Sequence, residues 1–445
     1  MLPAKMHLGP ALGAVSHNSS NFRCSNLANF SDAKQAGRLI EAIKSKDLKT
    51  LKRLLAKKPN GLDVFHRFDD GLEKMTALHY ASLSGYAKIV DELVSAQADV
   101  NVVTPFDEAT PLHLACQYPN EVEVLQMATT LIKAGAQVDV GDHSCCTPLI
   151  MASGMGHLNV VRLLLDRGAQ LNSRACQESY PLSVRWSLDN LQLSEKEADE
   201  MVDPFTGNSA LLQATREHHM PVVQELLKRG AILNIANKAG NTALHVAAKS
   251  ESRTIYSDPE KPSERTPVAG HVGVVKALLR SGAILDARNK HGETPLRRAV
   301  DGIHEIGEWS VSFDKREKEA TTFLTIMQLL LFAGSRPTNQ DSILSRLLEA
   351  VPKRRQHQHV NELIEKVAKM LIMAGGEVTS EMINVSMRHM PSIVGLLQRH
   401  KDSPMSLKQQ SRLAIRRYAR KPLFDTLHYV HLPSIMRQYV TLEIL

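Results

Sequence analysis

The sequence has few aromatic residues, few cysteines and no long apolar run. Phe, Tyr and Trp make up 4% of the 445 residues, so Leu, Val, Ile, Ala and Met must build the core. The five cysteines are scattered and include no CxxC pair, which argues against a disulfide scaffold and favours reduced, intracellular cysteines. No stretch approaches 18 consecutive apolar residues, so the sequence predicts no membrane-spanning helix.

Catalytic and cofactor motifs are also missing. The chain contains no Walker A loop and no GxGxxG, HExxH or G-x-S-x-G pattern. Cys145 and Cys146 are adjacent, and adjacent cysteines do not easily share one zinc ion. We therefore expect no enzyme, no cofactor and no metal site.

Length and charge favour an extended fold of several units. A single compact core stops growing at about 250–300 residues, so 445 residues predict several domains or a solenoid. The formal net charge is +7, and residues 405–445 contribute most of it, with seven basic and two acidic residues. The spacing of Arg412, Arg416 and Arg420 puts them on one face of a helix, which accounts for the charge, so we expect neither nucleic-acid nor membrane binding. Residues 1–32 are interpreted as a disordered leader.

A six-residue signature recurs along the chain. It begins with a Thr or Ser that can cap a helix, often followed by Pro, which suits the first helical turn. In three copies the fourth residue is His: His79, His113 and His245. The six copies begin at Thr76, Thr110, Thr147, Ser209, Thr242 and Thr294. A Val/Leu-rich segment follows each copy and ends at or near a Gly, which indicates a second helix.

The spacing of these features gives a period of 33 residues with interruptions. The undisturbed distance is 21 residues from the capping residue to the Gly and 12 from that Gly to the next cap. Longer intervals place insertions at about 176–208, 250–269 and 302–320, which we expect to be surface loops that select a partner, against the alternative that they are only tolerated at the surface. Atypical helix pairs before Thr76 and after Gly334 bring the expected total to about nine pairs.

The signature and its period resemble the ankyrin repeat. This resemblance implies an all-α solenoid over residues 33–400, in which each repeat is a turn followed by two antiparallel helices. It also implies that the signature histidines are structural. Asn101, with Leu93, Asp99 and Val100 before it, is spaced as in ankyrin repeats that an asparaginyl hydroxylase modifies. We name it as a candidate hydroxylation site, against the alternative that it only stabilises its turn.

Residues 405–445 resemble a SOCS box, a small helical domain. Three residues follow the spacing of its Elongin-binding helix: Leu407, Ser411 and Ile415. Ser411 stands where the family has Cys. Further on, four residues resemble the cullin box: Leu432, Pro433, Met436 and Tyr439. Val430 and His431 replace the first Leu-Pro of that box.

Together the two resemblances are those of an ankyrin repeat and SOCS box protein. They imply a cytoplasmic substrate-recognition subunit, with the nucleus as an alternative location. The SOCS box would recruit Elongin B, Elongin C and a cullin–RING scaffold for ubiquitination, and the repeats would hold a target that the sequence does not identify. The alternative is a non-catalytic ankyrin scaffold whose C-terminal helices cap the solenoid.

Overall fold

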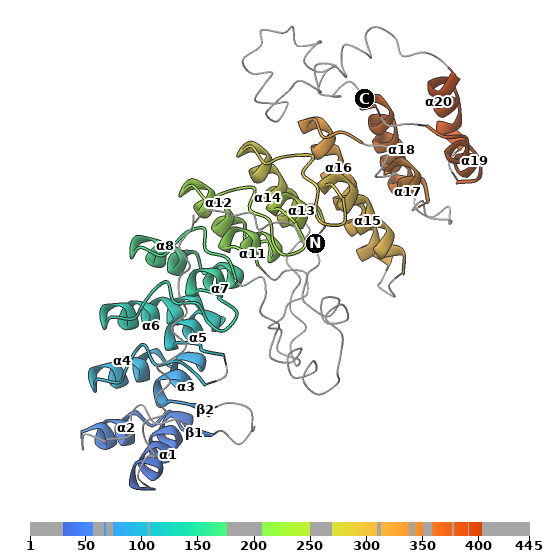
Figure 1. Cartoon of the computed structure of the whole chain (residues 1–445). Coiled ribbons are helices and arrows are strands. Elements are labelled where there is room, and N and C mark those ends of the chain that lie inside the picture. Colours follow the sequence, from blue (N-terminus) through green and yellow to red (C-terminus); the bar gives the residue numbers. More distant parts are fainter. Residues whose placement is uncertain are drawn as a thin grey trace, which may run out of the picture.

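The computed structural model describes most of the chain between residues 30 and 402 (Figure 1). The described segments are 30–56, 66–67, 74–105, 107–175, 207–249, 269–308, 313–337, 343–349, 358–375, 378–389 and 391–402. Within them the helices form nine consecutive pairs, the number expected from the sequence. The prediction of an ankyrin-type solenoid is therefore confirmed for this part of the chain.

The array opens with a pair that lacks the signature. Helix α1 (Phe30–Lys44) and α2 (Leu48–Leu55) are separated by a short turn, and Asp47 caps α2 by accepting hydrogen bonds from the next backbone amides. Two short strands, β1 (His66–Arg67) and β2 (Lys74–Met75), then pair in antiparallel fashion. Because α1 begins at Phe30, the folded part starts slightly before the end of the leader expected over residues 1–32. Residues 1–29 lie outside the described part.

Six pairs carry the signature, and we call them repeats 1 to 6. In each of them the first helix begins directly after the capping Thr or Ser. In order they are α3 (Ala77–Leu83) with α4 (Ala87–Ser95), α5 (Pro111–Gln117) with α6 (Glu121–Lys133), α7 (Pro148–Met155) with α8 (Leu158–Asp166), α11 (Ala210–Arg216) with α12 (Met220–Lys228), α13 (Ala243–Ala248) with α14 (Ala269–Arg280), and α15 (Pro295–Glu308) with α16 (Phe313–Ala333).

Two atypical pairs follow repeat 6. They are α17 (Ile343–Glu349) with α18 (Gln358–Met373), and α19 (Ser380–His389) with α20 (Pro391–Asp402). Helix α17 packs on α15 and α18 packs on α16, so the stacking continues without the signature. The core residues of these pairs, such as Leu347, Leu371 and Leu397, are fully buried.

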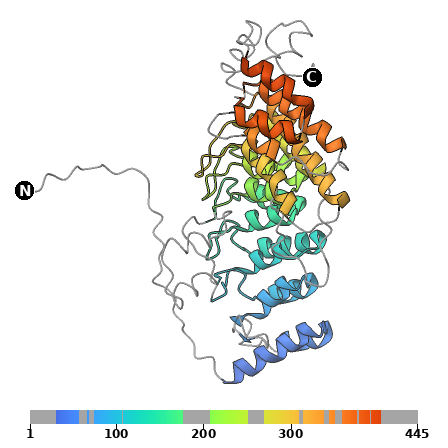
Figure 2. The same cartoon turned by 90° about the vertical axis from the view of Figure 1, so that its right-hand side faces the viewer.

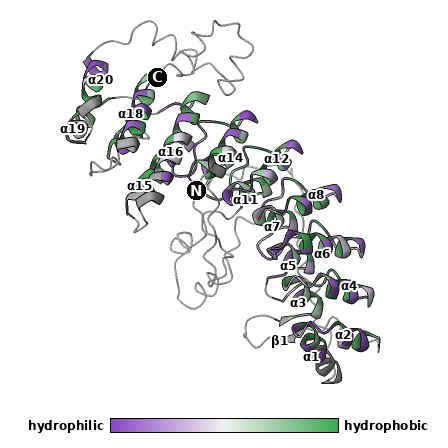
Figure 3. Ribbon diagram, turned by 180° about the vertical axis from the view of Figure 1, so that it is seen from behind, coloured by the Kyte–Doolittle hydropathy of each residue, from purple (hydrophilic) through white to green (hydrophobic). Residues whose placement is uncertain are grey.

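The helices form two parallel layers, as expected when repeats stack side by side. First helices contact the first helices of the next repeat, and second helices contact second helices, along the whole described array. Figure 2 shows the pairs stacked in one direction, with the connecting loops gathered on one side. Figure 3 shows hydrophobic residues where helices face one another and hydrophilic residues toward the outer ends of α4, α6 and α8. One continuous apolar core runs through the array.

The interpretation of 302–320 as a surface loop is wrong. Helices α15 and α16 extend through most of this range, which leaves only 309–312 outside the two helices. The ring of Phe323 on α16 lies against Gly302, where a Cβ atom would come within 2.5 Å of it. Gly302 therefore lets the lengthened helices pack closely. The extra residues add turns to two helices instead of forming a loop.

The other two predicted insertions fall mostly on residues 176–206 and 250–268, which lie outside the described part. The first one leaves the array between repeats 3 and 4. Its two ends are joined by an isolated antiparallel bridge between Arg174 and Ser209, with the Ala175 amide donating to the Asn208 carbonyl at 3.1 Å. Helix α7 still packs directly on α11. The stacking therefore continues across this insertion.

Among the described helices, none has the length and apolar character needed to cross a membrane.

Candidate protein-interaction surface

The three signature histidines join each first helix to the next repeat. In each, the ring Nδ1 lies 3.1 to 3.3 Å from the backbone N–H of the capping threonine and accepts a hydrogen bond from it. The ring proton must then be on Nε2, which donates to a carbonyl of the following repeat. These donor–acceptor pairs are His79 with Ala109, His113 with Cys146, and His245 with Glu293, at 3.0 to 3.1 Å.

Burial lowers the pKa of all three of these histidines to about 4, so the rings are neutral near pH 7. A neutral ring with both nitrogens engaged is a structural element and not an acid or base for catalysis. The structural interpretation of these residues from the sequence is confirmed.

Two further histidines connect the repeats in the opposite direction. His157 and His219 precede α8 and α12, and their Nε2 atoms lie 2.8 Å from the carbonyls of Tyr118 and Gly154 in the preceding repeat. His218 is buried and His219 is half-buried, although both lie in the turn between α11 and α12. The His219 ring lies against Gly156 of the preceding repeat, a contact that the local sequence does not reveal.

The turns before each first helix share one backbone conformation. The residue two positions before the cap has a positive φ in repeats 2 to 6: Glu108 (51°), Cys145 (53°), Gly207 (84°), Gly240 (79°) and Gly292 (74°). In four of these turns a side-chain oxygen at the start of the turn accepts from amides within it; those residues are Thr104, Asp142, Asn237 and Asn289. A Gly two residues before the cap is therefore a further sequence signal for this turn, in addition to the caps and the apolar spacing.

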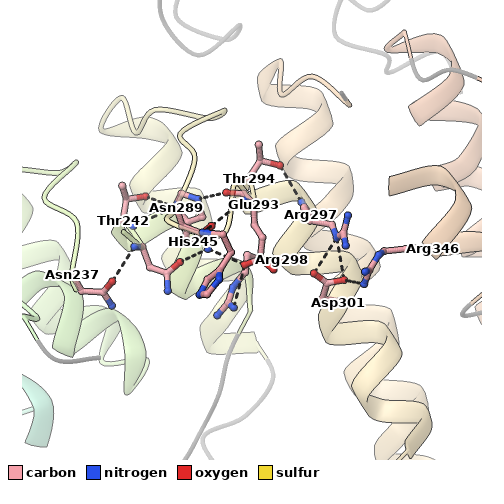
Figure 4. A network of polar contacts seen from close by, with 12 residues as sticks. Asn237, Thr242, His245, Asn289, Glu293, Thr294, Arg297, Arg298, Asp301 and Arg346 are labelled. Carbon is pink, nitrogen blue, oxygen red and sulfur yellow. Dashed lines mark hydrogen bonds and ion pairs between the residues drawn. The ribbon is translucent and has the colours of Figure 1, made fainter. Parts of the chain in front are cut away.

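A chain of buried amides links these turns across repeats 4 to 6 (Figure 4). Asn237 donates to Asn208, and Asn289 donates to Asn241, at 3.3 and 2.9 Å. Each asparagine is almost completely buried. In each pair the amide nitrogen that donates and the amide oxygen that accepts are hydrogen-bonded to each other. The chain of amides therefore fixes the register of neighbouring turns without leaving these buried polar atoms unpaired.

Repeat 6 replaces the signature histidine with Arg297. Its guanidinium Nε lies 3.1 Å from the Asp301 carboxylate on the same helix, and Arg346 of α17 approaches Asp301 at 2.7 Å (Figure 4). The two arginines thus connect repeat 6 to the atypical pair that follows. Neighbouring Arg298 pairs with Glu293 at 3.6 Å.

Asn101 takes part in a second set of contacts between repeats. Its side-chain nitrogen donates to the Gly135 carbonyl at 3.0 Å, and its oxygen accepts from the Gln137 amide at 2.9 Å. Asn172 and Asn234 accept in the same way from Ile232 and Ile284. Stabilisation of the turn is therefore observed, while hydroxylation of Asn101 stays a prediction that mass spectrometry of the protein from oxygenated cells can test.

The first helices carry a set of positions that differ from repeat to repeat in size and charge, some of which, such as Leu114 and Arg216, are buried. The set consists of the positions four, seven and eight residues after the cap, and we call it the inner face. In repeats 1 to 3 none of these positions carries a charge, and we call this part the uncharged inner face: Tyr80, Leu83, Ser84, Leu114, Gln117, Tyr118, Met151, Gly154 and Met155. In repeats 4 to 6 five of the eight described positions are charged: Arg216, Glu217, Lys249, Arg298 and Asp301.

The cysteines offer no catalytic or metal site in the described segments. Cys116 is buried, which raises the pKa of its thiol to about 12, and burial likewise raises the pKa of Cys146. Both are free thiols. Cys145 is disulfide-bonded, so the expectation of reduced cysteines is wrong for this residue. No group of three or more His, Cys, Asp or Glu in these segments could hold a metal ion.

The residues of the SOCS-box resemblance lie beyond Asp402, outside the described part of the chain. They are Leu407, Ser411, Ile415, Leu432, Pro433, Met436 and Tyr439. Their assignment to Elongin and cullin contacts therefore stays a prediction from the sequence.

Comparison with known proteins agrees with the geometry of the array. A family model for ankyrin repeats matches three overlapping segments, 39–142, 96–175 and 175–257. The chain is 25% identical over 233 residues to the B-cell lymphoma 3 protein homolog of Mus musculus, which covers 51% of this chain and 41% of that protein. It is 27% identical over 261 residues to NF-kappa-B inhibitor zeta of Homo sapiens, covering 57% and 33% respectively.

The chain thus spans less than half the length of these two curated relatives. Among solved structures, the ankyrin repeat domain of Bcl-3 is similar, with 24% identity and a TM-score of 0.40, covering 58% of this chain and 92% of that one. The signature, the paired helices and the matching family model lead to one assignment. Residues 39–257 are similar to the ankyrin-repeat family.

Proposed function

We propose that this protein is a non-catalytic scaffold that binds another protein through the inner face and the adjoining turns. The observation that carries the proposal is that some positions of the repeat are constant and structural, while others vary. Capping threonines, histidines and buried Leu and Val residues recur from repeat to repeat, whereas the inner-face positions differ in size and charge. Such variation on a constant frame is what selective recognition of a partner requires.

We further propose that the scaffold is the substrate-recognition subunit of an Elongin B/C–cullin–RING ubiquitin ligase. What supports this finer function is the sequence of the C-terminal segment, with Leu407, Ser411 and Ile415 spaced at one helical face. The chain itself would supply proximity between a bound target and the ligase, without a catalytic group of its own. The alternative is a scaffold whose C-terminal residues cap α19 and α20.

Reconstitution with purified Elongin B and C tests the finer function. Replacing a buried Leu by Ala typically costs about 2–5 kcal/mol, so Leu407→Ala with Ile415→Ala should abolish Elongin capture while the array stays folded. Leu432→Ala with Pro433→Ala should lose the cullin and keep the Elongins. Ser411→Cys should tighten Elongin binding by about 1 kcal/mol if a thiol fits the site better. Absence of Elongin binding by both the wild type and Ser411→Cys would favour the capping alternative.

The name of one relative suggests a first target to test. NF-kappa-B inhibitor zeta is similar over 57% of this chain, so purified NF-kappa-B subunits are a reasonable first panel for binding assays. Binding to a subunit should survive the Leu407→Ala and Ile415→Ala changes, because those residues lie outside the array.

A further inference from the structure

We propose that a surface on the second helices of repeats 4 and 5 binds an acidic amphipathic helix of a partner protein. Its residues lie near the C-terminal ends of α12 and α14, which pack side by side in the layer of second helices, and in the loops that follow (Figure 1). All of them are exposed, and we call this set the outer basic surface: Lys228, Ile232, Lys276, Arg280 and Ile284. It is separate from the inner face, so it would serve a second partner beyond the one proposed above.

The apolar part of the outer basic surface is a pair of isoleucines at equivalent places in repeats 4 and 5. Ile232 and Ile284 follow the Gly-Ala turns that end α12 and α14, and they are 56% and 53% exposed. The Ile284 amide donates to the Asn234 side chain at 3.1 Å, so the two loops are adjacent. Repeats 2 and 3 carry Gln137 and Gln170 at the same position. The fold therefore does not require an apolar residue here, and two exposed isoleucines side by side favour a binding role.

The basic part of this surface lies on the same two helices. Lys228 comes four residues before Ile232, and Lys276 and Arg280 lie one turn apart at the end of α14, before Ile284. Within the segments that the structure describes, none of these three cations forms an ion pair. The helix dipole favours basic residues at such ends, but it gives no reason for the isoleucines beside them.

The carboxylate nearest to these cations in the sequence is already neutralised. Glu225 is the only acidic residue on α12 and α14, and it is 7% exposed. It accepts hydrogen bonds from Arg162 of α8 at 3.2 Å and from Arg229 at 3.0 Å. An acidic side chain brought to the outer basic surface would therefore meet three unpaired cations, whereas a basic one would be repelled.

The spacing of the two isoleucines suits a helical partner. Packed helices lie about 8–10 Å apart, so equivalent residues on α12 and α14 are separated by about one such distance. Seven residues of an α-helix advance by about 10.5 Å. Apolar side chains at i and i+7 of a partner helix would therefore contact both Ile232 and Ile284. Glu or Asp residues one turn away on the same helix would reach the three cations.

The combination of groups favours a protein over the other anionic partners. Membrane binding scales with the apolar area inserted, and two isoleucines offer little of it. Nucleic-acid binding depends on cations that meet phosphates, and the isoleucines would add nothing to it. An acidic helix with apolar side chains uses both kinds of group.

The test selects a displayed library of helical peptides about 14 residues long against the full chain. We expect enrichment of acidic peptides with apolar residues at i and i+7. Their affinity should fall about tenfold or more for Ile232→Gln with Ile284→Gln, which gives both loops the residue of repeats 2 and 3. A similar loss is expected for Lys228→Glu with Arg280→Glu.

Two matched controls come from α6 of repeat 2. Val122→Gln removes an apolar residue that is 76% exposed, and Lys133→Glu reverses an exposed charge at the position that Lys228 has in repeat 4. Both controls should bind the selected peptides as the wild type does. Thermal unfolding should show that all variants are folded.

Five results would overturn the inference. The selection could enrich no acidic peptide, or binding could survive the double isoleucine variant. Vesicles of phosphatidylcholine and phosphatidylserine could bind the wild type but not that variant, which would make a membrane the partner. The wild type could be a dimer in light scattering that the variant dissociates, which would make a second copy the occupant. Replacing residues 178–205 with a Gly-Ser linker could raise peptide affinity about tenfold, which would make the insertion the occupant.

The proposed ligase function is tested separately on the same proteins. Elongin capture is expected to depend on residues beyond Asp402, so it should be unchanged in the double isoleucine variant.

Discussion

Asp142 is a carboxylate at a position where two other repeats have an amide. Its oxygen accepts from the amides of Ser144 and Cys146 at 2.8 Å, as Asn237 and Asn289 accept in their own turns. Burial raises the pKa of Asp142 to about 6 from an ordinary value of 3.8, so ionisation at neutral pH opposes folding. An amide would accept the same hydrogen bonds without a charge.

Asp142→Asn is therefore expected to stabilise the protein at pH 7.5, by about 1–3 kcal/mol for a shift of this size. Because the folded-state pKa is raised, the stability from the neutral carboxyl is fully present below pH 3.8 and is lost as pH rises through 6. The advantage of the variant should consequently shrink between pH 7.5 and pH 4.5 in urea unfolding. Asp402→Asn, at an exposed residue whose charge does not act on Asp142, is the control and should change little. A variant advantage that does not depend on pH would contradict the argument.

Ser153, unlike Asp142, has a buried polar group with no evident use in the fold. It is fully buried on α7, and its hydroxyl has no hydrogen-bond partner within the part of the chain that the structure describes. Ser82 and Thr215 are buried at the same position of their repeats, where repeat 5 has Ala248.

Ser153→Ala should raise the free energy of unfolding by about 1 kcal/mol, because it removes a buried hydroxyl that lacks a partner. Chemical unfolding at neutral pH measures the change. Ser281→Ala, at an exposed turn, should have no comparable effect. Destabilisation by Ser153→Ala would mean that the hydroxyl has a partner.

At the scale of elements, the insertion between repeats 3 and 4 is separable from the array. Its ends meet at the Arg174–Ser209 bridge, and α7 packs on α11 as first helices do elsewhere. The closure entropy of a loop grows only with the logarithm of its length. The stacking should therefore not depend on residues 178–205.

Replacing residues 178–205 with a short Gly-Ser linker should leave the helical circular dichroism per folded residue unchanged. The thermal midpoint should stay the same or rise, since a shorter loop gains up to about 2 kcal/mol of closure entropy. Deletion of residues 148–166, which removes α7 and α8, is the contrasting variant and should disrupt the array. Loss of cooperative unfolding in the first variant would show that the insertion is part of the stack.

At the scale of the whole molecule, the buried histidines make the array sensitive to acid. The pKa values of His79, His113 and His245 are about 4 in the folded chain, below the ordinary value of 6.5. Because these pKa values are lower in the folded chain, the histidines of the unfolded chain bind protons at a higher pH than those of the folded chain. The stability from the neutral rings is complete above pH 6.5 and is lost as pH falls toward 4.

The urea midpoint should fall steadily between pH 7 and pH 4.5, because the free energy of unfolding falls by about 1–3 kcal/mol for each of the three histidines. Protonation of Asp142 raises the free energy of unfolding as the pH falls, but this is the effect of one group against that of three histidines. His291→Gln changes an exposed residue and should leave the pH profile unaltered. A midpoint that is constant over this range would contradict the buried, neutral state of the three rings.

The sequence by itself determined the period, the helix starts and the class of the fold. Capping threonines, proline at the first turn and apolar spacing act within a few residues, so they can be recognised without knowing the neighbours. The structural role of the three signature histidines also followed, through the resemblance to ankyrin repeats. The lengthening of repeat 6 was detected from spacing, but its form was not, because a loop and two longer helices have the same residue count.

Only the tertiary structure decided which surfaces are exposed and which polar groups meet. The His219 ring donates to the Gly154 carbonyl of the preceding repeat, and the amide chain from Asn208 to Asn289 joins residues that lie 29 and 48 positions apart. The uncharged inner face likewise exists only because stacking brings α3, α5 and α7 side by side. These features depend on contacts between repeats, and a repeat buries its core and orients its turns only against its neighbours.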